Sequence, residues 1–190
     1  MTLKKLLAYI LILALVSGLL SGCGGTNIPS DVETVTFTDS AGREVAVPAE
    51  ITRVAPSGAV ATMFLASVCP EYMVSIASTP SSAQYPYLDQ SLIRLPTTGQ
   101  LYGSKSTINL EALLDAKPQV IIDLGDAKDG IAHDMDSLQK QTGIPVVFIE
   151  ADLPHMAEAF RMLGRLIGTK SSRCEELAAY VEETVSLAET

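Results

Sequence analysis

The sequence predicts an α/β fold: a Rossmann-like lobe with a mainly parallel β-sheet flanked by helices, preceded by an N-terminal β-hairpin. Short apolar runs rich in β-branched residues alternate with segments of helical periodicity, which is typical of parallel βαβ units. Consecutive apolar residues, many of them β-branched, make up the centre of the run 119–123 and nearly all of 144–149, which indicates strands covered on both faces. With 190 residues, the chain has the length of one domain plus a leader.

Composition narrows the class of protein. Hydrophobic residues make up 47% of the chain and charged residues 18%, which fits a globular protein with a core and not a disordered chain. The formal net charge is −9, and no cluster of Lys and Arg stands out. Because a phosphate backbone must be neutralised by clustered basic residues, we expect no nucleic-acid partner.

The first 22 residues have the pattern of a signal peptide. Lys4 and Lys5 precede a run of fifteen almost wholly apolar residues, 6–20, which is shorter than the roughly 20 residues of a membrane-spanning helix. The run ends in Leu20-Ser-Gly-Cys23, which resembles the lipobox of bacterial lipoproteins and implies cleavage before Cys23 and lipidation of its sulfur. The alternative is an uncleaved anchor with an incidental cysteine. Residues 23–33 are then a lipidated tether.

The next elements are predicted from alternation and turn chemistry. A hairpin is expected over 35–38 and 44–47, around a turn at 39–42. A short strand at 51–55 and a helix at 59–68 follow, and then a second buried strand at 72–76. The apolar face of this helix is expected to comprise Val60, Met63, Phe64 and Val68.

Residues 77–106 form a long, loop-rich segment. It contains three prolines, many Ser and Thr residues and three of the six tyrosines, with a short strand expected at 93–95. A loop of this length in a compact domain is more often functional than not.

A helix, a strand and a loop are predicted over 107–130. Thr107 or Asn109 can cap a helix whose apolar stripe comprises Leu110, Leu113 and Leu114. Pro118 ends this helix, and the strand 119–123 leads into a polar loop at 124–130. Such loops, at the carboxyl ends of parallel strands, are where ligands bind.

The same plan repeats to the end of the chain. A helix at 131–141 with Gly143 as its C-terminal cap leads to the strand 144–149. Asp152 is a candidate N-cap for an amphipathic helix that ends at Gly168. Ser171 or Ser172 caps a last helix at 173–190, whose apolar face comprises Leu177, Tyr180, Val181 and Val185.

The signals for enzymatic and metal chemistry are weak. His133 and His155 lie in separate helical contexts without a zinc-binding spacing, so we expect surface or partly packed histidines and no resident metal or cofactor. Ser57 lacks the G-x-S-x-G context of a hydrolase nucleophile.

Two alternatives stay open at this point. The carboxylates of Asp123, Asp126 and Asp129 have the chemistry to bind a hard cation, although capping and solvation are favoured. Cys69 and Cys174 either pair in an oxidising compartment or remain two thiols, which is the default expectation.

Four segments in order resemble the N-terminal lobe of bacterial ABC-transporter substrate-binding lipoproteins of the iron-siderophore, haem and vitamin B12 family. They are the opening 35–48 with the pattern T-D-x-x-G-R-x-V-x-V-P, then Arg53-Val-Ala-Pro-Ser57, the stretch 109–122, and 142–148. The resemblance covers residues 34–190. It implies an α/β lobe at 34–170 and, at 171–190, the start of the long inter-lobe helix, with the second lobe absent.

The resemblance also implies a function. The chain is expected to capture an iron complex, such as a ferric siderophore or haem, or a cobalamin-like chelate, and to deliver it to a membrane permease and its ATPase without being an enzyme. The alternatives are a truncated lobe acting only as an interaction module, or an enzyme or metal-cluster scaffold. A lobe alone is expected to bind its cargo weakly, because it supplies one wall of the cleft.

Site residues follow from the ligand-side loops of that family. Tyrosines in these loops offer flat apolar faces with polar tips, suited to a bulky chelate, and only Lys105 and Lys128 supply nearby positive charge. Glu111 matches the acidic residue that docks onto the permease, and complementing the helix N-terminus is its simpler role. The expected cargo-binding residues are Pro56, Ser57, Tyr85, Tyr87, Gln100, Leu101, Tyr102, Asp123, Gly125, Asp126 and Glu150.

Overall fold

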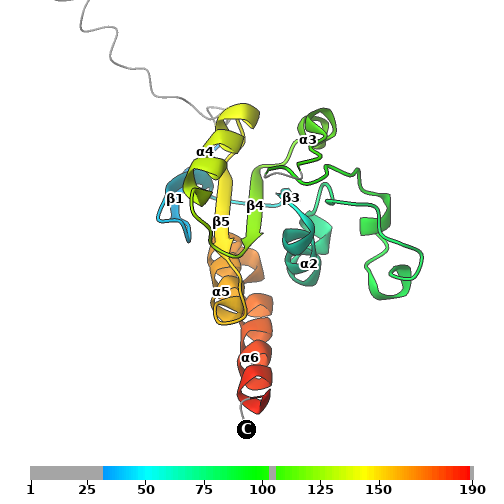
Figure 1. Cartoon of the computed structure of the whole chain (residues 1–190), viewed down its shortest axis with the longest axis vertical. Helices are drawn as coiled ribbons and strands as arrows, with labels where there is room; N and C mark the ends of the chain where they lie inside the picture. The colour runs from blue at the N-terminus through cyan, green and yellow to red at the C-terminus, as the bar shows by residue number, and fades with distance from the viewer. Residues whose placement is uncertain (1–31, 103–105, 189–190) are drawn as a thin grey trace, which may run out of the picture.

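A computed structural model describes residues 32–102 and 106–188 of the chain. At its centre lies a parallel sheet of three strands, β3 (Val54–Pro56), β4 (Val120–Gly125) and β5 (Val146–Glu150), in the order β3-β4-β5. Since all three strands run in the same direction, their carboxyl ends meet at one edge of the sheet (Figure 1).

Helices cover both faces of this sheet. On one face pack α2 (Ala59–Val68), α5 (Met156–Leu166) and α6 (Ser171–Ala188), against a core that includes Ile122 and Val147. On the other face pack α3 (Leu110–Ala116) and α4 (Ile131–Thr142), against Ile121 and Phe148. Neighbouring strand residues therefore face opposite cores, which explains why consecutive apolar residues occur in β4 and β5 and not an alternation of apolar and polar ones.

The last helix packs on α5. Cys174 and Ala178 are the buried residues of α6, and Arg161 of α5 forms ion pairs with Glu175 and Glu182. Beyond this packing, α6 runs past the end of the sheet at which β4 points, so it projects from the domain (Figure 1).

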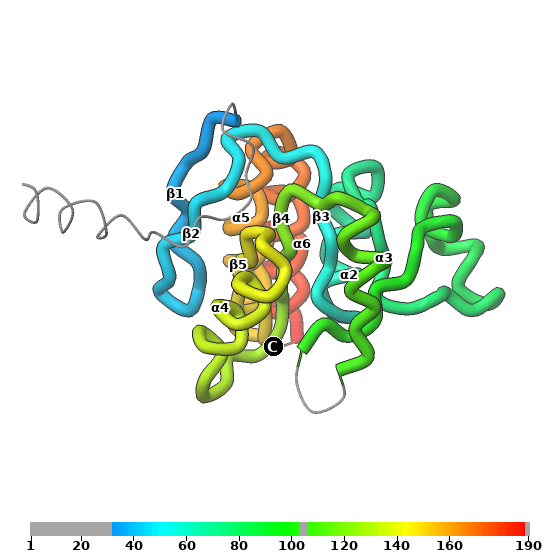
Figure 2. The backbone as a smooth tube through the Cα atoms, turned by 90° about the horizontal axis from the view of Figure 1, so that it is seen from above, coloured from blue at the N-terminus to red at the C-terminus, as the bar shows by residue number. Residues whose placement is uncertain are grey.

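The hairpin comprises β1 (Thr34–Thr38) and β2 (Glu44–Pro48), paired antiparallel as predicted. It lies beside β5, on the opposite side of the domain from the loop-rich segment that precedes α3 (Figure 2). The backbone N–H of Ser40 donates to the carbonyl of Phe148 at 2.9 Å, and Val45 and Val47 enter the core. The hairpin thus covers the open edge of β5, which would otherwise present unpaired backbone groups.

Most predicted elements are confirmed, and two predicted strands are wrong. In place of the strand at 72–76, the chain forms a 3-10 helix, Pro70–Tyr72, followed by isolated bridges from Met73 to Val54 and from Ile76 to Thr97. In place of the strand at 93–95 stands the 3-10 helix Leu92–Arg94. Met73, Ile76 and Leu92 are nevertheless buried in the core on the α2 side of the sheet, so burial of these side chains did not require a continuous strand.

The predicted apolar face of α2 is also partly wrong. Val60 and Met63 are 43% and 69% exposed, whereas Ala61, Phe64, Leu65 and Val68 are buried. Nearly every residue of this helix is apolar, so periodicity could not identify the buried side.

The structure tests the predicted capping residues of three helices. The side chain of Asn109, and not that of Thr107, caps α3 by accepting from the N–H of Ala112 at 3.0 Å. Gly143 ends α4 in the left-handed conformation, as predicted. Asp152 does not cap α5: His155 occupies that position, and Asp152 accepts its N–H at 3.0 Å, which closes the turn before the helix.

Both cysteines of the described part are buried and free, in agreement with the default expectation. Burial raises the pKa of Cys69 to about 12 and that of Cys174 to about 11. Over residues 32–102 and 106–188, no helix has the length and apolar character needed to cross a membrane. The predicted signal peptide and Cys23 lie outside the described residues.

Candidate functional site

The candidate site is the carboxyl edge of the sheet. Pro56, Gly125 and Glu150 are the last residues of the three strands, and Gly125 pairs with Glu150 across β4 and β5. The loops that leave these strands bring polar side chains to one end of a doubly covered parallel sheet, which is where open α/β folds bind ligands.

A buried polar cluster joins two of these strands to the long loop. Asp123 of β4 accepts a hydrogen bond from the Ser57 hydroxyl and one from the Tyr102 hydroxyl, the latter at 2.5 Å. Ser57 and Asp123 are buried, and Tyr102 is half-buried. The structure therefore brings together three of the predicted site residues that lie far apart in the sequence.

The electrostatics of this cluster are set by burial. Desolvation raises the pKa of Asp123, and the hydrogen bonds from Ser57 and Tyr102 oppose the rise only in part. Burial also raises the pKa of the Tyr102 phenol, and the nearby Asp123 carboxyl adds to that effect. The Lys128 ammonium lies 4.6 Å from the centroid of the Tyr102 ring and forms an ion pair with Asp134 at 3.1 Å. Its positive charge therefore acts on both the Asp123 and the Asp134 carboxylates of this cluster.

Stability should therefore depend on pH through Asp123. Because its pKa is raised in the folded state, the native protein holds a proton that the unfolded chain releases above about pH 4. The free energy of unfolding should fall as pH rises through the window between these two pKa values. Asp123→Asn should remove this fall, which urea denaturation followed by circular dichroism at pH 4 to 8 would measure. Asp126→Asn, at an exposed carboxylate of the same edge, is the control, and parallel curves for Asp123→Asn and wild type would contradict the prediction.

The loop from Thr98 to Tyr102 carries the tyrosine to this edge. The N–H of Leu101 donates to the Ser57 carbonyl at 2.9 Å, and the Leu101 side chain is buried in the core under α3 and α4. The Gln100 side chain lies over Gly58, where a Cβ would be 2.5 Å from its Oε1. Both residues therefore lie next to Ser57. Gln100 presents a polar side chain there, and the buried side chain of Leu101 fixes the loop to the core.

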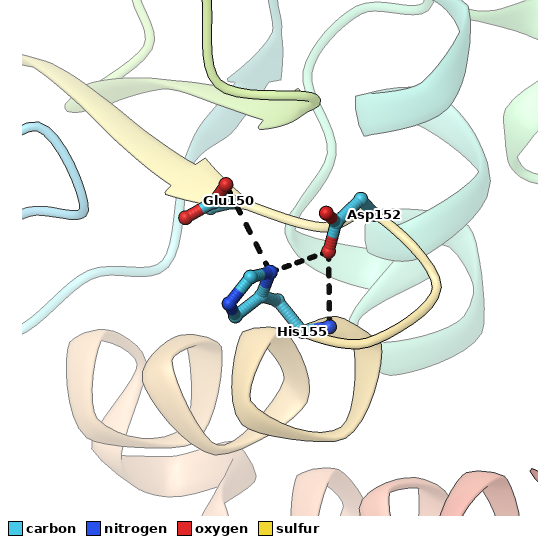
Figure 3. A group of neighbouring side chains, drawn as sticks. All are labelled: Glu150, Asp152 and His155. Carbon is cyan, nitrogen blue, oxygen red and sulfur yellow. Dashed lines mark hydrogen bonds and ion pairs between the residues drawn. The ribbon is translucent and has the colours of Figure 1, made fainter.

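A second polar cluster lies at the end of β5 (Figure 3). The Nδ1 atom of His155 is 2.5 Å from Asp152 Oδ1 and 3.8 Å from Glu150 Oε1, and its hydrogen bond to Asp152 raises the pKa of His155. Within the described ranges, this is the one group of three or more His, Cys, Asp or Glu residues whose ligand atoms all lie within 4.8 Å of one another. The sequence prediction included Glu150 but missed Asp152 and His155. The spacing E-x-D-x-x-H directly after a buried strand was the available signal.

The remaining predicted residues lie apart from these clusters. Tyr85 and Tyr87 belong to a 3-10 helix, Tyr85–Tyr87, and are 36% and 89% exposed. Beside it, α2 and the segment 76–92 enclose an apolar pocket of about 160 Å³, which neither tyrosine lines. Asp126 and Asp129 are exposed and do not gather with the buried Asp123 into a group of cation ligands. Lys105 lies outside the described residues.

No protein-family model matches the sequence, and no curated protein matches it either. Among solved structures, the chain is similar to an ABC transporter solute binding protein from Sulfurospirillum deleyianum, with 27% identity, a TM-score of 0.62, and coverage of 76% of this chain and 45% of that one. A periplasmic solute binding protein from Veillonella parvula matches with 22% identity, a TM-score of 0.64, and coverage of 82% and 47%. The heme binding protein HmuT matches with 19% identity, a TM-score of 0.56, and coverage of 86% and 51%.

The chain spans about half the length of these solved structures. The predicted fold class, a parallel α/β lobe with a hairpin and a final long helix, is confirmed. The resemblance to ABC-transporter substrate-binding proteins is confirmed as a shared fold over that half.

Proposed function

We propose that this chain forms a cargo-binding lobe of a solute-binding protein that supplies an ABC importer. One observation carries the proposal: in a fold shared with such proteins, the Ser57–Asp123–Tyr102 cluster stands at the carboxyl edge of the parallel sheet. Beyond that edge α6 projects from the domain (Figure 1), in the place where a helix leading to a second lobe would run. Cargo would then lie against the edge and beside α6.

The chemistry of the edge favours binding over catalysis. The Ser57 hydroxyl donates to a carboxylate, whereas a serine nucleophile needs a general base such as histidine. Tyr102 presents a half-buried ring whose hydroxyl is held by Asp123, so its orientation is fixed before any ligand arrives. An aromatic ring held in place beside a small set of fixed polar groups is a usual lining of a small-molecule site.

The proposed cargo is an iron complex, such as a ferric siderophore or haem, or a cobalamin-like chelate. Two of the structurally similar proteins are described with metal-containing ligands: HmuT as a heme binding protein, and MolA of Haemophilus influenzae bound to molybdate. Tyr102, Gln100 and the loop after β4 form the wall that would face such a ligand. The proposed location is the cell envelope, with a lipid anchor at Cys23 and the permease with its ATPase as partners.

The binding test uses isotope-labelled protein and nuclear magnetic resonance. Cyanocobalamin, a gallium-substituted siderophore and a gallium porphyrin would be titrated separately, since all three are diamagnetic. Because one lobe contacts only part of an enclosed ligand, we expect dissociation constants in the high micromolar to millimolar range. Shifts at Ser57, Tyr102 and Gly125, with none at the opposite edge near α3, would support the proposal. Absence of shifts with every ligand at millimolar concentration would overturn it.

Permease docking gives a separate prediction. Glu111 is exposed in the first turn of α3, a helix far from the carboxyl edge (Figure 1). Glu111→Ala should reduce uptake of the cargo by cells at least several-fold while leaving cargo affinity unchanged. Asp115→Ala removes an exposed carboxylate from the other end of α3 and is the matched control. Normal uptake by the Glu111 variant would leave that residue only its effect on the helix terminus, about 0.3–1 kcal/mol.

A further inference from the structure

We propose that Glu150, Asp152 and His155 form a binding site for a divalent transition-metal ion. The three side chains come from the end of β5, the turn after it and the start of α5, and they converge on one point (Figure 3). The edge of the imidazole that carries Nδ1 faces both carboxylates. The site goes beyond the proposed cargo function and is tested with metal alone.

The spacing of the donor atoms suits a metal ion. One ligand atom from each residue lies within 4.8 Å of the others, and His155 Nδ1 stands 3.8 Å from Glu150 Oε1. Ligands bound at about 2.0–2.2 Å in a tetrahedral arrangement lie roughly 3.4 Å apart. A small rotation of Asp152, whose Oδ1 now lies in hydrogen-bond contact with His155 Nδ1 at 2.5 Å, opens that pair to the same separation. The metal would replace the proton of this hydrogen bond.

The backbone holds the three ligands close before a metal arrives. Glu150 ends a strand that is paired with β4, and the next N–H, of Ala151, donates to the Gly125 carbonyl at 2.9 Å. Asp152 accepts the backbone N–H of His155 at 3.0 Å, and His155 precedes α5 directly. Since strand, turn and helix start are all fixed, binding would order little beyond the side chains themselves.

The set of donors selects the class of metal. Imidazole is a ligand for zinc, copper, iron and nickel, whereas Ca²⁺ and Mg²⁺ take oxygen ligands. One imidazole with two carboxylates therefore favours a divalent transition metal over Ca²⁺ or Mg²⁺. The side chains are 51% exposed at His155, 35% at Asp152 and 28% at Glu150, so an ion can enter, and at least one coordination position remains for water or for a bound molecule.

The competing explanation is a turn closed by a His–Asp ion pair that binds nothing. The two explanations differ in what titration with Co²⁺ would show. The full-length protein, purified in detergent and treated with chelator, would be titrated with CoCl₂ while visible absorbance is recorded. We expect one equivalent to bind and to produce d–d bands stronger than those of hydrated cobalt. Calorimetry with ZnCl₂ should give the same stoichiometry.

Variants identify the ligands. His155→Gln should weaken cobalt binding at least about tenfold, since loss of a group that merely orients a ligand already costs about 10- to 100-fold. His133→Gln removes the other histidine, which is exposed on α4, and should leave binding unchanged. Glu150→Gln and Asp152→Asn preserve shape and should each weaken binding, which keeps the test valid if the His155 variant fails to fold.

Competition separates the metal classes. Ca²⁺ and Mg²⁺ at millimolar concentration should not displace cobalt, whereas Zn²⁺ should displace it stoichiometrically. The proposal would be overturned by a spectrum equal to that of hydrated cobalt, or by equal affinities of wild type, His155→Gln and Glu150→Gln. Because no cargo is present, failure of this experiment leaves the proposed transport function untouched, and failure of the cargo titration leaves the metal site untouched.

Discussion

Replacing Gly99 with alanine is expected to lower the free energy of unfolding by about 2–5 kcal/mol. Gly99 has φ +76°, and a Cβ built on it would lie 2.2 Å from the backbone oxygen of Thr107. The left-handed conformation costs an alanine about 1–2 kcal/mol, and the clash adds about 1–3 kcal/mol as the backbone yields. The flexible end of a side chain could move aside at little cost, but a carbonyl in the backbone cannot.

Gly42→Ala is the matched control for this effect. Gly42 has nearly the same φ, +73°, but nothing lies within 4 Å of a Cβ built on it. This variant should therefore lose only the conformational part, about 1–2 kcal/mol. Urea denaturation followed by circular dichroism measures both, and equal losses would contradict the role assigned to the contact with Thr107.

Gly99→Ala should also change the geometry of the candidate site. Thr107 is bonded twice to Gln100, since its N–H donates to the Gln100 carbonyl at 2.9 Å and its hydroxyl oxygen accepts from the Gln100 N–H at 3.1 Å. Displacing Thr107 would shift Gln100 and, through it, the Tyr102 hydroxyl that bonds Asp123. We therefore expect altered chemical shifts at Ser57 and Tyr102 in Gly99→Ala but not in Gly42→Ala.

Local signals in the sequence were enough for most of the fold. The two predicted buried strands, β4 and β5, form within two residues of their predicted bounds, and α2 spans Ala59–Val68 as predicted. The order of elements then implied a parallel sheet, because right-handed crossovers leave few other arrangements. The short run at 72–76 instead enters the core through Met73 and Ile76, with isolated bridges to Val54 and Thr97 in place of a continuous strand.

The site was predictable only in its position. The rule that ligands lie at the carboxyl ends of parallel strands placed Ser57, Asp123 and Glu150 at one edge. It did not predict that Asp123 would be buried and would accept a hydrogen bond from the Tyr102 hydroxyl. This contact depends on the path of the loop that carries Tyr102, and no periodic pattern in the sequence predicts that path. His155 is exposed, as expected, but its approach to Glu150 was not predicted, because it depends on how tightly the turn at 151–155 closes.

The opening motif T-D-x-x-G-R has a structural explanation. The Asp39 carboxylate accepts from the backbone N–H groups of Ala41 and Arg43 within the turn, and from Phe148 on β5 at 3.2 Å. It also pairs with the Arg43 guanidinium at 2.9 Å, which in turn donates to the Val146 carbonyl at 3.0 Å. Two side chains of the turn thereby satisfy backbone groups on the open edge of β5.

Asp39→Ala is expected to cost about 3–5 kcal/mol of unfolding free energy. The Asp39 side chain is fully buried and that of Arg43 is only 10% exposed, so removing the carboxylate leaves a nearly buried guanidinium without its main partner. It also leaves the N–H of Phe148, which is buried in β5, without its acceptor. Urea denaturation should show the loss, and hydrogen exchange should show the N–H of Phe148 losing protection before the rest of β5.

Asp136→Ala removes the other carboxylate that Arg43 contacts, at 2.8 Å, and is the control for this experiment. Its side chain is 66% exposed, so the pair is screened by water and should contribute less than about 1 kcal/mol. If burial and the backbone contacts to β5 determine the contribution of Asp39, the two variants must differ by several-fold in their loss of stability. Similar losses would mean that Arg43 needs any one carboxylate and that the hairpin does not depend on Asp39 to hold the edge of β5.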